Sequence, residues 1–149
     1  MDRKRWILIP PALWIASLFL IQIFGSIAAP DSSEMPDECP EGSQNCARLL
    51  LEIDASPEDV QSATMDWIMS QDQTTVQSES ESDSHTVFRT RWMMFQDDFF
   101  VETGCTEYTT WIQIHSESRL GAGDMGVNQA RIDTLIDYLS TLDFEPHEC

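Results

Sequence analysis

The feature that most constrains this chain is an apolar run close to its N-terminus. Residues 6–29 carry no charged side chain, and their polar side chains are those of Ser17, Gln22 and Ser26. About 20 such residues are enough to cross a bilayer. The run is therefore predicted to be a membrane anchor or a signal peptide, and about 110 residues remain to form one ordinary domain.

The residues around the apolar run predict its orientation. A basic cluster at residues 3–5 precedes it and should stay in the cytoplasm, so the rest of the chain lies outside. Cleavage after Ala28 would make the product secreted or periplasmic, but the run is longer than the 7–15 apolar residues usual in a signal peptide, which favours a retained anchor. The predicted organisation is an anchor or signal over residues 1–29, a polar linker over 30–38 and a single domain over 39–149.

The charge of the exported part is strongly negative. Without residues 2–5, five basic and 25 acidic residues remain, a formal net charge of −20. Such a surface repels nucleic acids, which are therefore not predicted partners. Lys4 is the chain's one lysine. An acidic, nearly lysine-free composition suggests a salt-adapted organism, because concentrated salt screens the self-repulsion.

Four cysteines outside the cytoplasm predict disulfides, with three possible pairings. We favour Cys39–Cys46, which closes a short loop containing proline and glycine, and Cys105–Cys149, which would tie the C-terminus to a hairpin. A metal site is the less favoured alternative, because the cysteine spacing is not C-x-x-C and no histidine is close in sequence. No metal or cofactor is predicted.

Two helices follow the apolar run. The first is predicted to begin at Pro57, with Ser56 as its N-cap and Asp59 at its third position, and to end near Gln71. The last helix begins near Val127, where apolar residues return with helical spacing. Two helices over one face of an antiparallel sheet are the economical packing for this element order.

Between and around these helices the pattern predicts strands. Asp97 and Asp98 are interpreted as a turn, and Trp92 is predicted to face inward with Phe88. The predicted strands are residues 48–53, 74–77, 86–95, 99–103 and 109–114. The fold class is therefore α+β, an antiparallel sheet of four to five strands with two helices on one face, after an N-terminal transmembrane or signal segment.

Residues 95–132 contain a specific sequence pattern. Phe-x-Asp-Asp at 95–98 is followed at 116–132 by Ser-x-Ser-Arg-x-Gly-x-x-Asp-x-Gly-Val-Asn-x-x-Arg-Ile. This run resembles the family called domain of unknown function 1499, whose activity is not established, and the likeness extends over about residues 39–142. The chain departs from that family at His115 and Gln129, where relatives often carry arginine, and at Glu117, where they carry a small residue.

The glycine-containing turn before the last helix is the candidate ligand site. Glycines allow close backbone approach, and a helix N-terminus and arginines attract anions. The predicted ligand-binding residues are Arg119, Gly121, Gly123, Asp124, Gly126, Asn128 and Arg131. An alternative explains the same residues without a ligand: Asp124 caps the helix, and Arg119 pairs with Asp124 or Asp97.

No catalytic residue is predicted. His115 and Ser116 are neighbours on a strand and point to opposite faces, so they cannot readily act together. His85 and His147 are interpreted as solvated. A calcium site is disfavoured because the spacing of its candidate acids matches no calcium loop. Those acids are Asp97, Asp98, Glu102 and Asp124.

The predicted function is a non-enzymatic, membrane-tethered module that binds a small ligand or a protein of the cell envelope. Its predicted partners are the membrane, through residues 6–29, and that ligand or envelope protein. The alternatives are an envelope hydrolase that uses the 119–131 turn and a structural accessory subunit.

Overall fold

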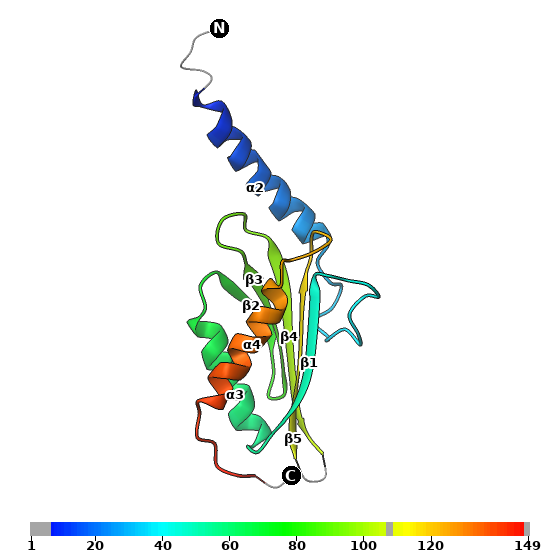
Figure 1. Cartoon of the computed structure of the whole chain (residues 1–149), viewed down its shortest axis with the longest axis vertical. Helices are drawn as coiled ribbons and strands as arrows, with labels where there is room; N and C mark the ends of the chain where they lie inside the picture. Colours follow the sequence, from blue (N-terminus) through cyan, green and yellow to red (C-terminus); the bar gives the residue numbers. More distant parts are fainter. Residues whose placement is uncertain (1–6, 107–108, 148–149) are drawn as a thin grey trace.

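The computed structural model describes residues 7–106 and 109–147. A five-stranded antiparallel sheet in the order β1-β5-β4-β3-β2 carries two helices, α3 and α4, on one face, and a third helix, α2, extends from one end of the sheet (Figure 1). The predicted fold class is confirmed. The elements are α2 Ile9–Ile27, β1 Cys46–Ile53, α3 Pro57–Ser70, β2 Thr74–Glu79, β3 Asp83–Arg89, β4 Gln96–Cys105, β5 Thr110–Ser118 and α4 Val127–Ser140.

Helix α3 begins where the sequence predicts. Pro57 is its first residue, and the Ser56 side chain accepts a hydrogen bond of 3.1 Å from the Asp59 backbone N–H. This bond satisfies one of the N–H groups that a helix start leaves without a partner. The apolar side of α3 then turns toward the sheet, where Trp67 lies 6.0 Å from both Phe88 and Phe99 between ring centroids.

The core fills the space between the two helices and the sheet. Alternation along β5 directs Ile112 and Ile114 into it, while Trp111 points to the other face and is half-buried. The core residues shared by helices and sheet include Val60, Trp67, Ile68, Phe88, Phe99, Val101, Ile112, Ile114, Ile132, Leu135 and Leu139.

The other face of the sheet is crossed by the segment predicted to be a linker. The Ser33 hydroxyl lies 3.1 Å from His85 Nδ1, the Pro36 carbonyl accepts a hydrogen bond from Arg48, and the Met35 sulfur lies 3.3 Å from Gln113 Nε2. The predicted linker is polar in composition, but its residues Ser33, Met35 and Pro36 contact the domain along this face.

Helix α2 is long and apolar enough to cross a membrane, and among its residues Gly25 alone is buried. Its last two turns contact the domain. Gln22 donates a hydrogen bond of 2.8 Å to the Met94 carbonyl and accepts one of 2.8 Å from Gln96, and Arg119 donates one of 3.3 Å to the Gly25 carbonyl. A Cβ on Gly25 would lie 2.8 Å from Gln96 Oε1, so a larger residue at this position would require the Gln96 side chain to shift.

The strand predicted over residues 86–95 is too long. β3 ends at Arg89, and the chain then forms a loop over residues 90–95 that is closed by a hydrogen bond of 2.9 Å from the Thr90 N–H to the Phe95 carbonyl. Met94 has a left-handed backbone, with φ of 57°. The predicted inward position of Trp92 is therefore wrong: its side chain is 73% exposed.

Asp97 and Asp98 do not form a turn. Both lie near the start of β4, and they are 1% and 5% exposed. Aspartate has a local preference for turns and is uncommon in strands. It can nevertheless occupy a buried strand position when charged partners from other parts of the fold compensate its burial. Those partners, two arginines, belong to the candidate site.

Candidate functional site

The candidate site is built on the turn between β5 and α4, residues 119–126, called here the glycine turn. Gly121 and Gly126 have φ of 104° and 81°, a backbone region that favours glycine. The Asp124 carboxylate accepts hydrogen bonds of 2.9 Å from the Gly126 N–H and 2.5 Å from the Asn128 N–H. Asp124 therefore caps the first turn of α4, although Gly126 occupies the N-cap position.

The disulfide loop, residues 39–46, contacts the glycine turn. Cys39 and Cys46 form the first predicted disulfide. Asn45 donates hydrogen bonds to the Ser118 and Gly121 carbonyls, at 3.0 and 3.1 Å. No described cysteine is free. Cys149 lies outside the described residues, so its pairing with Cys105 stays a prediction.

On the helix-covered face of the sheet, Arg131 forms an ion pair with Asp97 at 2.7 Å. Ser118 donates a hydrogen bond of 2.6 Å to the other Asp97 oxygen. Asn128, which is 1% exposed, accepts hydrogen bonds from Ser116 and Arg131 and donates one of 2.8 Å to the Asn45 carbonyl. This connected polar network joins α4, β5, β4 and the disulfide loop, and its members compensate one another's burial.

On the opposite face, Arg119 forms a two-pronged ion pair with Asp98, with both contacts at 2.7 Å. His85 Nε2 lies 2.7 Å from the same carboxylate, and its ring stacks on Phe100 at 4.2 Å. Burial raises the pKa of Asp98, but hydrogen bonds from Arg119 and His85 outweigh that effect and hold it below its ordinary value. The interpretation of His85 as solvated is wrong, because it is 3% exposed.

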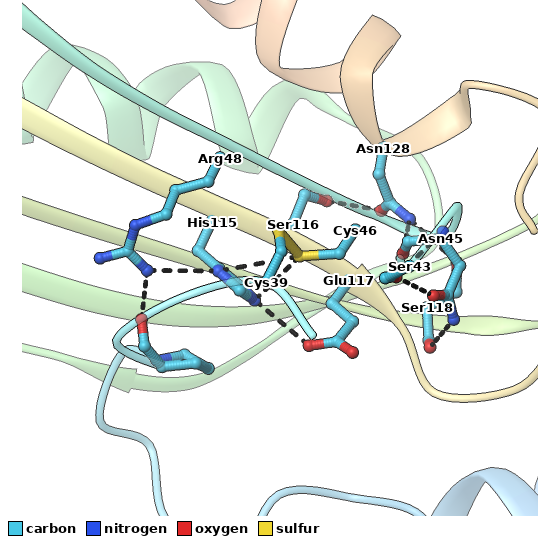
Figure 2. The surroundings of a disulfide bond; sticks show 11 residues. Cys39, Ser43, Asn45, Cys46, Arg48, His115, Ser116, Glu117, Ser118 and Asn128 are labelled. Atoms are coloured by element: carbon cyan, nitrogen blue, oxygen red, sulfur yellow. Dashed lines mark hydrogen bonds and ion pairs between the residues drawn. A yellow bond between two sulfur atoms is a disulfide. The ribbon is translucent and has the colours of Figure 1, made fainter. Parts of the chain in front are cut away.

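His115 lies beside the disulfide, between Arg48 and Glu117 (Figure 2). Its Nε2 atom is 3.5 Å from Cys46 Sγ and 3.3 Å from Glu117 Oε2, and its Nδ1 atom is 3.4 Å from an Arg48 nitrogen. Two positions that depart from the family pattern, 115 and 117, therefore contact each other. Burial lowers the pKa of His115, and Arg48 adds to this, while Glu117 acts in the opposite direction without reversing the result.

The lowered pKa of His115 predicts a pH dependence of stability. A histidine that is harder to protonate in the folded state stabilises the fold above its unfolded pKa of about 6.5, and this contribution is lost as the pH falls from there through the lower folded value. We expect His115→Gln to flatten this slope of the unfolding free energy against pH. The exposed His147 provides the control: His147→Gln should leave the slope in place. An unchanged slope in His115→Gln would contradict the assignment.

The structure brings together only part of the predicted ligand set. Arg119 and Arg131 pair with neighbouring aspartates that point to opposite faces of β4, so the two guanidinium groups do not converge on one anion. Asn128 is buried beneath the turn. The exposed part of the glycine turn, with Gly121 and Gly123, forms one wall of a groove. The ligand-binding role of the seven residues stays a prediction.

This groove has a volume of about 360 Å³ and lies between the glycine turn and the loop over residues 90–95. Its lining is mostly apolar, and it includes Trp92, Met93, Phe95, Leu120 and Met125 together with Gly121, Gly123 and Asp124. A larger hollow of about 1000 Å³ beside α3 is lined mainly by polar and acidic residues. Ligand sites are usually apolar with a few polar groups, which favours the smaller groove.

Sequence reasoning missed the loop side of this groove and the role of His85. The available signal was the pairing of two aspartates with two arginines inside one sequence pattern, in a domain with five arginines. Because buried acids require cations, two internal ion pairs are compatible with this pattern, but the burial of the two aspartates is visible only in the fold. The alternation along β4 would then have separated the two pairs onto opposite faces.

The fold and the site define a small α+β domain, preceded by an apolar helix, whose glycine turn is supported by two buried Arg–Asp pairs. The chain belongs to the family described as protein of unknown function DUF1499, whose model matches residues 34–139. Among curated proteins, none matches the chain.

Proposed function

We propose that this protein is a membrane-anchored, extracytoplasmic binding module that is not an enzyme, and that it holds an apolar ligand of the cell envelope in the groove between residues 90–95 and the glycine turn. The observation that carries this proposal is the apolar lining of the groove at the turn that the sequence singled out. Gly121, Gly123 and Asp124 would contact the ligand. Arg119, Gly126, Asn128 and Arg131 would hold the turn in its shape.

The charges around the groove support an apolar rather than an anionic ligand. Arg119 and Arg131 each form an ion pair of 2.7 Å with a buried carboxylate. At the start of α4, two backbone N–H groups already donate hydrogen bonds to the Asp124 carboxylate. Groups that already have partners of opposite charge contribute little attraction to a further anion. Burial of an apolar side chain or hydrocarbon tail in the groove would be favourable, and it would leave these ion pairs intact.

Helix α2 would serve as the retained anchor, with the domain outside the cytoplasm. Its exposed apolar surface suits lipid, and the basic cluster at residues 3–5 favours the cytoplasmic side for the N-terminus. The Cys39–Cys46 disulfide agrees with an oxidising compartment. Residues 30–38 would connect the anchor to the domain formed by residues 39–149.

The test is native mass spectrometry of the full chain extracted from its host's membranes under non-reducing conditions. We expect a retained small-molecule mass in the wild type and its loss in Leu120→Glu, which puts a charge into the apolar groove. Leu50→Glu is the matched control, because Leu50 is 62% exposed on the sheet away from the groove, and the mass should persist there. A wild-type chain without a retained mass, or a mass that survives Leu120→Glu, would refute the proposal.

A further inference from the structure

Four apolar residues of the groove lining, two of them exposed and two half-buried, lie close together. Trp92 is 73% exposed and Met125 is fully exposed, and Met93 and Leu120 lie beside them in the groove lining. These four residues are called here the apolar tip. The tip belongs to the loop over residues 90–95 and to the glycine turn, and both lie at the end of the sheet from which α2 departs (Figure 1).

A contact with α2 sets the position of the 90–95 loop along the axis of that helix. The Met94 carbonyl accepts a hydrogen bond from Gln22, which lies five residues before the end of α2 at Ile27. An α-helix rises 1.5 Å per residue, so the loop contacts α2 about 7.5 Å before the end of that helix. If the end of α2 marks the membrane boundary, the loop reaches about as deep as interfacial helices, which bury their apolar face by roughly 5–10 Å.

The side chains of the tip suit that depth. Tryptophan is enriched at the membrane–water interface, and the Arg91 guanidinium lies 5.8 Å from the centroid of the Trp92 ring, where its charge can remain near the headgroups. Met125 adopts a left-handed backbone, with φ of 58°, which is unfavourable for a residue with a side chain. Full exposure of that side chain to water adds to the cost, and burial in lipid would offset it.

We propose that the apolar tip, Trp92, Met93, Leu120 and Met125, inserts into the outer face of the bilayer that holds α2. The groove then opens into lipid, and its ligand is an acyl chain of a membrane lipid. This inference rests on the proposed function, because it requires a retained α2 and a groove that binds a ligand. The strongly acidic remainder of the domain stays in water, since its net charge is repelled by anionic headgroups.

Brominated lipids test the insertion, because bromine quenches tryptophan fluorescence on contact. The full chain, with Trp6 and Trp14 changed to phenylalanine, is reconstituted into phosphatidylcholine vesicles with and without bromine midway along the acyl chains. We expect bromine to lower the emission of this parent chain. Trp92→Phe should abolish the decrease. Trp111→Phe should preserve it, because Trp111 lies near the start of β5, at the other end of the sheet.

The outcomes separate this inference from the proposed function. A parent chain that bromine does not quench, or quenching that persists in Trp92→Phe, overturns the insertion, while a retained mass that is lost in Leu120→Glu would still support the binding module. A retained mass that matches a host membrane lipid supports the acyl-chain ligand, and a water-soluble compound overturns it. A mature chain that begins after Ala28 overturns both proposals.

Discussion

Replacement of Arg131 by methionine is expected to lower the free energy of unfolding by about 3–5 kcal/mol, the usual effect of removing one partner from a buried ion pair. Asp97 is 1% exposed and would keep the Ser118 hydroxyl as a donor, but it would lose its cation. Because small domains are stable by only about 5–15 kcal/mol, much of the variant could be unfolded at ambient temperature. The measurement is urea unfolding of the full chain in nanodiscs, followed by near-ultraviolet circular dichroism.

Two further variants make this result specific. Arg89→Ala removes an arginine whose bond to Thr75 is exposed, and it should change stability by no more than about 0.5 kcal/mol. Asp97→Asn combined with Arg131→Met should be less destabilised than the sum of the two single changes, because the uncompensated charges disappear together. Additive effects, or an Arg131→Met chain as stable as Arg89→Ala, would show that the pair does not hold α4 to the sheet.

Much of the fold could be predicted because its signals are local. Ser56, Pro57 and Asp59 mark the start of α3 through capping chemistry that depends on neighbouring residues. The glycine turn and the beginning of α4 at Val127 follow from the same kind of signal. The end of β3 could not be predicted, because the residues after Arg89 alternate like a strand and the reversal depends on the left-handed backbone at Met94.

The sequence predicted where the candidate site lies along the chain, but not which contacts its residues make. The pattern identified Arg119, Asp124, Asn128 and Arg131, but Arg119 and Arg131 have partners in β4, more than 20 residues earlier. Long-range pairing decides whether an arginine is available to a ligand, and spacing along the chain carries no such information. For the same reason the groove was not foreseen, since its second wall is a loop that the sequence predicted as a strand.

Arg119→Ala provides the second large effect, an expected loss of about 2–3 kcal/mol, the scale of hydrogen bonds to a charged group. The loss should be smaller than for Arg131→Met, because Asp98 keeps His85 as a partner. The variant should also weaken the contact between the domain and α2, since Arg119 donates to the Gly25 carbonyl. Urea unfolding against pH, between about pH 2.5 and 7, reports both the size and the origin of the effect.

The pH profile distinguishes loss of the Asp98 pair from a general loosening of the turn. Because the folded pKa of Asp98 lies below its ordinary value, the pair stabilises the wild type above about pH 4 and is lost as the pH falls through the folded pKa. Without the guanidinium, the pKa of Asp98 is depressed less, because burial still raises it and only His85 remains to lower it. The acid-dependent loss of stability that Asp98 causes should therefore be smaller in Arg119→Ala. Arg119→Lys keeps the charge but not the two-pronged contact, and its profile should lie between the other two. If the three profiles are parallel and differ only in height, Arg119 acts through packing rather than through Asp98.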